Sequence, residues 1–329
     1  MKVLPFLIFT FSMLFGCVEN TTGSSNSSLS EHPTNHSKDS LAAPVAVSIS
    51  LSSYQFPYQL RKPSQAFKFA HVLEEISGLC MTSDSRFLYS VQDEKGNIYK
   101  IDVTTGKIVE RFNFGKRGDY EGLTYHEDKF FITKSNGTIY KVENLGEDNQ
   151  KVTNYKTDLK GKNDVEGLCY QPSTNSLLIA CKGIPTFGET SEEANNRKSV
   201  YRFDLASNEL KEEPCYKITL KKVQQFLKKS ASPNDFKKFL SYLDEDDHFN
   251  FSPSGIAIHP KTEDVYILSS SKKMLLIINQ TGEIQHLVKL SKKIHRQPEG
   301  IAFAEDGTLY IANEGKGGHG RIFVYKPQF

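Results

Sequence analysis

The sequence contains no tryptophan, only five cysteines among 329 residues and almost no excess of charge of either sign. Five cysteines are too few for a disulfide scaffold. Lys and Arg number 41 against 39 Asp and Glu, so the net charge of +2 gives no overall attraction for nucleic acid. Hydrophobic residues make up 38% of the chain, which is too many for a disordered protein and too few for a membrane protein with several spans. We therefore expect a large soluble β-rich domain without a nucleic-acid partner.

Long hydrophobic runs are also absent, apart from residues 3–15, which follow Lys2. As a helix this run would be roughly 20 Å long, too short for a hydrocarbon core of about 30 Å, and the pattern is that of a secretory signal peptide. It ends in LFGC at 14–17, which resembles a bacterial lipobox. We expect residues 1–17 to be a lipoprotein signal peptide with lipidation at Cys17. An ordinary signal peptide or an uncleaved anchor is the alternative.

Residues 18–43 are rich in Ser, Thr and Asn and cannot bury enough apolar surface to become ordered. They are expected to form a disordered tether that lets a lipid-anchored domain stand off its bilayer. Val18 rather than Asp follows the cysteine, so nothing signals retention in an inner membrane, and an outer-membrane location is expected if the source is Gram-negative. Residues 44–329 then form the folded domain.

An internal repeat dominates those residues. Five segments share a Ser or Glu, a glycine and a Leu or Ile, with their glycines at positions 78, 122, 167, 255 and 300. After each glycine the pattern predicts the rest of a first strand, a polar turn and further short strands. Units of about 45 residues with four strands are typical of β-propeller blades. The predicted fold is all-β, a propeller of five four-stranded blades, with six blades as the alternative because the third gap is twice as long as the others.

Two further patterns favour five blades. Residues 54–74 are strand-like at 54–56 and 66–72 and are expected to supply the outer strand that the last unit lacks, which would close the ring. Residues 218–243 have a helical period, with Thr219 and Ser232 as N-caps, and predict a helical hairpin between two blades. A second insertion at 184–198 lies between strands two and three of one blade. Both insertions fall at the end of the propeller where the five glycine segments begin.

The residues before the five glycines would form a ring around the axis: Ser77, Glu121, Glu166, Ser254 and Glu299. Three converging carboxylates raise one another's pKa unless a cation or a shared proton relieves them, and an all-oxygen site suits Ca²⁺. Asp119 and Asp164 are candidate additional ligands. Two alternatives stay open, namely that the glutamates only bind the backbone of the next blade, or that they act in acid–base catalysis.

A second ring is expected where the second strands end, at Asp93, Ser135 or Lys134, Lys182, Ser270 and Glu314. Mixed charges there could bind a ligand, with ordinary solvated loop tips as the alternative. Four cysteines besides Cys17 lack metal-ligand spacing and are expected to be buried free thiols: Cys80, Cys169, Cys181 and Cys215. A Cys169–Cys181 disulfide is the alternative.

The recurring E-G-L/I segments, the G-x-I-Y/F-x-I/V-D third strands and the QPEGIAF unit at 297–303 resemble the SdiA-regulated family of bacterial extracytoplasmic β-propellers over residues 54–329. The resemblance implies a membrane-associated propeller that binds calcium; the helical hairpin departs from the family pattern. We expect a non-enzymatic module at the cell envelope that binds a small ligand or an envelope protein. The alternative is a metal-dependent hydrolase, phytase-like or lactonase-type, in which Lys134 or Lys182 binds the anion and Asn313 and Asp93 flank a glutamate.

Overall fold

The computed structural model describes residues 47–185, 195–245 and 248–328. The expected signal peptide, Cys17 and the tether lie outside these residues. Among the described residues, no helix has both the length and the apolar character needed to cross a bilayer.

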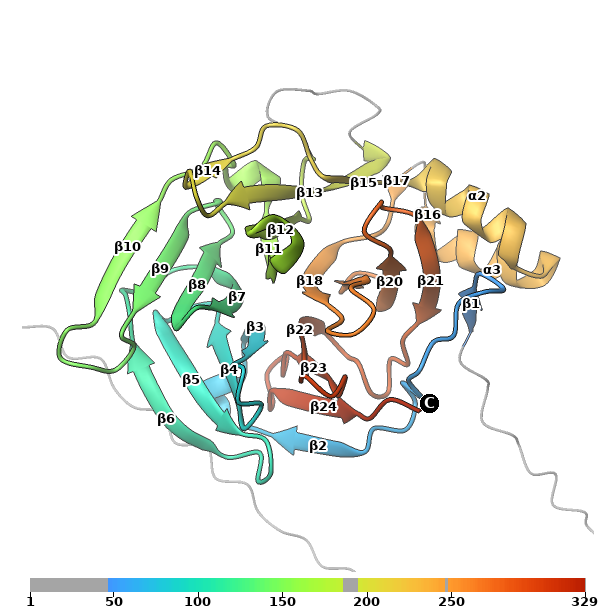
Figure 1. The fold of residues 1–329 in the computed structure, drawn as a ribbon. Coiled ribbons are helices and arrows are strands. Elements are labelled where there is room, and N and C mark those ends of the chain that lie inside the picture. The colour runs from blue at the N-terminus through green and yellow to red at the C-terminus, as the bar shows by residue number, and fades with distance from the viewer. Residues whose placement is uncertain (1–46, 186–194, 246–247, 329) are drawn as a thin grey trace, which may run out of the picture. The chain divides into compact units, whose positions relative to one another are not determined.

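Five antiparallel sheets surround a common axis as the blades of a propeller (Figure 1). Blade 1 contains β3 (Ile76–Met81), β4 (Phe87–Gln92), β5 (Asn97–Asp102) and β6 (Ile108–Asn113). Blade 2 contains β7 (Tyr120–His126), β8 (Lys129–Lys134), β9 (Ile139–Glu143) and β10 (Lys151–Tyr155). Blade 3 contains β11 (Val165–Gln171), β12 (Ser176–Cys181), β13 (Arg197–Asp204), β14 (Glu209–Leu210) and β15 (Tyr216–Thr219).

Blade 4 contains β18 (Pro253–Ile258), β19 (Val265–Ser269), β20 (Met274–Ile278) and β21 (Ile284–Lys289), with β1 (Ser48–Ser50) on its outer edge. Blade 5 contains β22 (Pro298–Phe303), β23 (Leu309–Asn313), β24 (Arg321–Tyr325) and β2 (Gln65–Lys68). Short 3₁₀ turns lie at His71–Leu73, Gly161–Asn163 and Pro172–Thr174. The predicted five-bladed all-β propeller is confirmed.

The ring closes as the sequence predicted, because β2 pairs with β24 as the outer strand of the last blade. The prediction was wrong in two details. Residues 54–56 form no strand, and their aromatic rings pack instead against blade 4, where Phe56 stacks on His286. The chain also adds β1 to the outer edge of blade 4, which the sequence analysis missed. Because every closing strand lies within the described residues, we expect residues 44–329 to fold by themselves.

The predicted hairpin is confirmed as α2 (Leu220–Ser230) and α3 (Pro233–Leu243) between blades 3 and 4, followed by the small ribbon β16 (Asp244–Glu245) and β17 (His248–Phe249). The hydroxyls of Thr219 and Ser232 accept hydrogen bonds from the backbone N–H groups three residues on. The apolar side of the hairpin is buried in the core shared by blades 3 and 4, for example at Leu227 and Phe239.

The innermost strands contact one another in a closed cycle, β3–β7–β11–β18–β22 and back to β3. At the repeated glycines these backbones lie too close for a side chain. A Cβ on Gly78 would lie 2.5 Å from the backbone nitrogen of Leu123, and one on Gly300 would lie 2.4 Å from the carbonyl oxygen of Ser77. Close approach of the neighbouring strand therefore explains the glycine in four of the repeats, and at Gly167 the fit is tight, with the nearest atom 3.0 Å from a Cβ.

The described cysteines are free thiols, three of them buried and Cys215 half-buried. Cys169 lies opposite Leu178 in the β11–β12 ladder, and Cys181 lies opposite Val165, so the two cysteines are not cross-strand neighbours. The predicted free thiols are confirmed and the Cys169–Cys181 disulfide alternative is wrong.

Replacing Gly300 by Ala should destabilise the ring closure, because the new Cβ would press on the backbone of β3. We expect the free energy of unfolding of residues 44–329 to fall by about 1–3 kcal/mol in urea titrations. The control is Gly161→Ala, where a Cβ would meet no atom within 4 Å. Equal effects of the two substitutions would contradict close packing at the axis.

Candidate functional site: the two ends of the propeller axis

A β-bulge lies at each residue of the predicted ring, and three of these residues, Glu121, Glu166 and Glu299, line the axis. In the five innermost strands, the pairing with the second strand shifts register at the residue before the repeated glycine or next to it. A bulge bends its strand and redirects a side chain. The affected positions are Ser77, Glu121, Glu166, Ser254 and Glu299. We call these five residues the axial ring and call this end of the propeller, where the innermost strands begin, the entry end.

The three carboxyl groups of the axial ring are close enough to influence one another. Burial, together with the charge of Glu166, raises the pKa of Glu121 to about 9. Burial also raises the pKa of Glu299 to about 8, to which the charges of Glu314 and Glu121 contribute. The Ser77 hydroxyl lies 2.8 Å from Oε2 of Glu121 and offsets part of this shift. Protons therefore relieve much of the repulsion in the axial ring at neutral pH.

Lys182 supplies the positive charge of the axial ring. Its Nζ lies 2.6 Å from Oε1 of Glu166 and 3.5 Å from Oδ2 of Asp164. Burial opposes the charged ammonium, but the two carboxylates outweigh it and raise the pKa of Lys182. Burial raises the pKa of Glu166 to about 8, less than that of Glu121, because Lys182 favours the ionised carboxylate.

As placed, these side chains do not fit a Ca²⁺ ion. Among the residues that the structure describes, no group of three or more His, Cys, Asp or Glu side chains is arranged to hold a metal. The Lys182 ammonium lies beside Glu166, one of the carboxylates that would bind the calcium ion. Asp119 is hydrogen-bonded to the Ser135 hydroxyl. The calcium site stays a prediction.

A second acidic group lies at the entry end between blades 1 and 5. Burial and a hydrogen bond with the Glu75 carboxyl raise the pKa of Glu314 to about 7. Burial and the charges of Glu75 and Glu94 raise the pKa of Asp93 to about 6. The sequence analysis predicted Asp93 and Glu314 but missed Glu75, which joins them.

The remaining predicted residues do not converge on the axis as one site. Lys134 lies over the Tyr120 ring, with Nζ 5.4 Å from its centroid. The Ser254 hydroxyl donates to the carbonyl of Pro298, and the Ser270 N–H donates to the carbonyl of Ser252. The Asn313 amide is hydrogen-bonded to the buried His295 ring.

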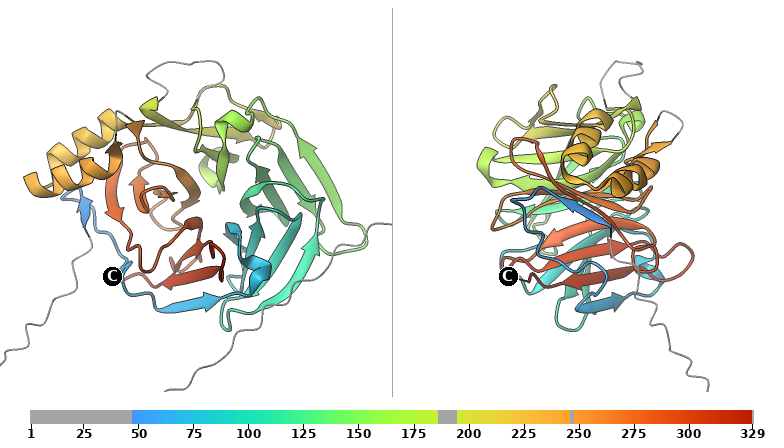
Figure 2. Two further views of the ribbon diagram at one scale, coloured as in Figure 1. Left: turned by 180° about the vertical axis from the view of Figure 1, so that it is seen from behind. Right: turned by 90° about the vertical axis from the view of Figure 1, so that its right-hand side faces the viewer.

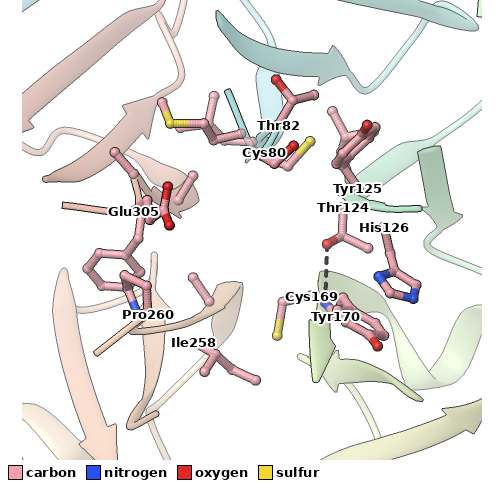
Figure 3. A pocket seen from close by; sticks show the side chains of 18 of the residues that line it. Cys80, Thr82, Thr124, Tyr125, His126, Cys169, Tyr170, Ile258, Pro260 and Glu305 are labelled. Carbon is pink, nitrogen blue, oxygen red and sulfur yellow. Dashed lines mark hydrogen bonds between the residues drawn. The ribbon is translucent and has the colours of Figure 1, made fainter. Parts of the chain in front are cut away.

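The opposite end of the axis, where the innermost strands finish, contains a cavity of about 640 Å³ (Figure 3). We call it the axial cavity and this end the cavity end. The cavity is lined by the last residues of all five innermost strands and the turns that follow them. Within the axial ring the free space shrinks to about 10 Å³, room for about one water molecule. The axial ring therefore plugs the channel.

One wall of the axial cavity is aromatic and its charges are negative. The rings of His126 and Tyr170 stack with centroids 3.6 Å apart, and the backbone N–H of Tyr170 donates to the Thr124 hydroxyl (Figure 3). Burial lowers the pKa of His126. Carboxylates line the mouth at Glu127, Asp128 and Glu305, and none of the described lining residues is Lys or Arg. Glu127 also pairs with Lys129, which lies outside the lining, at 3.2 Å. The sequence analysis missed this site, although aromatic residues recur three positions after Gly122, Gly167 and Gly300.

The fold and the plugged axis define a five-bladed β-propeller with a cavity at one end. Within that class, the sequence profile of the SdiA-regulated family matches residues 48–209 and 210–316. The chain belongs to the SdiA-regulated family. No curated protein matches it in a sequence search.

Several solved structures are similar to this chain at low sequence identity. Glutaminyl cyclase from Myxococcus xanthus matches with a TM-score of 0.50 and 11% identity over 81% of this chain and 96% of that one. A luciferin-regenerating enzyme matches with a TM-score of 0.46 and 12% identity over 82% of this chain and 98% of that one. A protein of unknown function from Bacteroides thetaiotaomicron matches with a TM-score of 0.47 and 15% identity over 75% of this chain and 58% of that one.

The raised pKa values predict that the domain loses stability as pH rises. Above about pH 4.5 the unfolded chain releases the protons of Glu121, Glu166 and Glu299, whereas the folded chain keeps them. Their contribution to the free energy of unfolding is therefore complete below about pH 4.5 and decreases as the pH rises to about 9. Glu121→Gln mimics the protonated form. The free energy of unfolding that is lost between pH 5 and pH 9 should therefore be smaller in this variant by about 1 kcal/mol or more, which gives a shallower slope against pH. Urea titrations across this range measure it.

The control for Glu121→Gln is Glu147→Gln, at an exposed loop position. An unchanged slope in Glu121→Gln would show that this carboxyl is not protonated in the folded state. Calcium added at pH 8 tests the metal prediction in the same assay. A rise in stability that Glu121→Gln abolishes would place the ion at the axial ring.

Proposed function

We propose that this propeller is a non-enzymatic binding module of the cell envelope that takes a small organic cation into the axial cavity. One observation carries the proposal, namely a cavity of about 640 Å³ with an aromatic wall and with carboxylates at its mouth. Aromatic faces attract cations, and carboxylates at the mouth attract them over longer distances. The size lies within the range of small-molecule sites.

The groups that line the axial cavity favour binding over catalysis. A cysteine acts as a nucleophile through its thiolate, and burial raises the pKa of both lining thiols, Cys80 and Cys169. The His126 ring is stacked flat on Tyr170. None of the hydrogen bonds of the described chain joins it to a lining hydroxyl or thiol. The wall therefore lacks a paired nucleophile and base.

The hydrolase alternative has less support. It placed the reaction at the entry end, with Lys134 or Lys182 binding the anion. Lys182 is held by Glu166 and Asp164, and Lys134 lies over Tyr120. The space of about 10 Å³ inside the axial ring has no room for a substrate.

A single introduced tryptophan tests the binding proposal. The chain has no tryptophan, so Tyr170→Trp places the only one beside the axial cavity and keeps the aromatic stack. Titration with choline or spermidine should give a saturable change in its fluorescence, and sucrose should give none. Neutralising the mouth with Glu127→Gln, Asp128→Asn and Glu305→Gln should weaken binding by roughly tenfold, because three nearby charges are lost.

The matched control removes three carboxylates from exposed turns outside the cavity lining, through Glu147→Gln, Asp148→Asn and Glu283→Gln. It should retain the affinity. The proposal fails if neither cation changes the fluorescence, if sucrose changes it equally, or if the control loses as much affinity.

The proposal also includes the cellular location predicted from the sequence. The propeller would be an extracytoplasmic domain that lipidated Cys17 holds to a membrane. Its support is the pattern of residues 1–17, which precede a polar segment. We expect the wild-type chain to stay with bacterial membranes after a high-salt wash and Cys17→Ser to be released, as measured by fractionation and immunoblot. Membrane retention of Cys17→Ser at its full mature size would contradict a lipid anchor.

A further inference from the structure

The helical hairpin carries a strong positive charge in a chain whose net charge is only +2. Its lysines are all exposed, at Lys221, Lys222, Lys228, Lys229, Lys237 and Lys238, and its only carboxylate is Asp235, which is hydrogen-bonded to Ser232. Among the described residues, none of these lysines forms an ion pair with a carboxylate. The apolar side of the hairpin is buried, so the surface it presents is basic.

The basic surface continues from the hairpin onto the entry end of blades 4 and 5. Nζ of Lys289, at the end of β21, lies 5.1 Å from the ring centroid of Tyr242 in α3. Burial, together with the charges of Lys292 and Lys273, lowers the pKa of Lys289 to about 8. Lys316 lies close enough to Lys273 to lower its pKa too. The charge of Glu299 acts on Lys273, and the charge of Lys316 acts on Glu314. Two acidic residues, Asp244 and Glu245, directly follow α3.

The described chain begins at this surface. The carbonyl of Val47 accepts a hydrogen bond from the backbone N–H of Lys289, and Val47 and Leu51 pack against the core that buries the hairpin. Strand β1 contacts both α2 and β21 at the rim of the ring (Figures 1 and 2). The segment that precedes Val47, and that contains Cys17, therefore joins the propeller beside the lysines.

The axial cavity lies at the end of the propeller opposite Lys273, Lys292 and Lys316 and has the opposite charge. The hairpin lies at the rim, where Lys222 and Lys229 of α2 adjoin Glu283 in the turn between β20 and β21. The turns at the cavity end hold Glu127, Asp128 and Glu305, whereas Lys273, Lys292 and Lys316 lie in loops of the entry end. An anionic surface would attract the hairpin side and repel the mouth of the cavity.

We propose that the lysine surface of α2 and α3, together with Lys273, Lys289, Lys292 and Lys316, docks the propeller on an anionic lipid bilayer with the axial cavity facing away from it. The inference rests on the membrane address proposed above, and it is independent of what the cavity binds. Basic side chains close to anionic headgroups add their attraction together, and salt screens it. A bilayer is the occupant to which we commit, because Val47, through which the propeller is connected to the predicted anchor, lies beside Lys289.

Vesicle co-sedimentation of residues 44–329 tests the proposal without the anchor. The domain should bind phosphatidylcholine vesicles that contain about 30% phosphatidylglycerol, and should not bind pure phosphatidylcholine. Raising the salt from about 0.1 M to 0.5 M should release it. Lys221→Gln, Lys222→Gln, Lys228→Gln and Lys229→Gln together should weaken binding by roughly tenfold or more.

The matched control removes the same charge from exposed lysines at other elements, through Lys107→Gln, Lys151→Gln, Lys211→Gln and Lys326→Gln. It should bind within about twofold of the wild type. Equal loss in both variants, or equal binding to neutral vesicles, would overturn the proposal. Retention on soluble polyphosphate without binding to vesicles would also overturn it, because the partner would then be a polymer.

Orientation is measured with single tryptophans and a dansyl-labelled lipid in the anionic vesicles. Energy transfer should be stronger from Tyr242→Trp, which adjoins the lysines, than from Tyr170→Trp at the axial cavity. Equal transfer would contradict the proposed orientation. None of these results depends on Cys17 or on a cavity ligand, so failure here is separate from failure of the proposed function.

Discussion

The close approach of five backbones at one axis is the constraint on which the rest of the structure depends. Each innermost strand contacts the next in a closed cycle, and a Cβ on Gly122 would lie 2.6 Å from the Cβ of Leu168. Glycine relieves the crowding, and a bulge beside it turns the preceding side chain toward the axis. The same geometry repeats in all five blades. The axial ring is thus a direct consequence of how the blades pack.

That geometry creates an electrostatic problem in three of the five positions. Glutamates at 121, 166 and 299 are held in a space with room for about one water molecule, where separate negative charges are unfavourable. The structure offsets the repulsion with protons, with the Ser77 hydroxyl and with the Lys182 ammonium. The buried glutamates stabilise the axis only while they keep their protons and their contacts with Ser77 and Lys182. It also closes the channel, so the two ends of the propeller are separate environments.

The sequence was informative wherever the determinant is local or repeated. The glycine spacing predicted five blades, and the N-caps Thr219 and Ser232 located the start of each helix to the residue. The positions of Glu121, Glu166 and Glu299 followed from the same repeat. Strand β1 was missed because its formation depends on a free edge of β21, which no local pattern of three residues reveals. Residues 54–56 alternate like a strand, but their rings pack on blade 4 instead of pairing.

The axial cavity escaped the sequence analysis for a related reason. Its lining comes from the last residues of five strands that are far apart in the chain, and only the closed ring brings Tyr125, Tyr170 and Glu305 to one mouth. Antiparallel blades send successive loops to alternate ends, so a chain with a net charge of +2 can still place lysines at one end and carboxylates at the other. The net charge of the whole chain does not reveal this separation of charge between the two ends. An insertion at the entry end, such as the hairpin, can add charge there without altering the cavity, because the plugged axis separates the two.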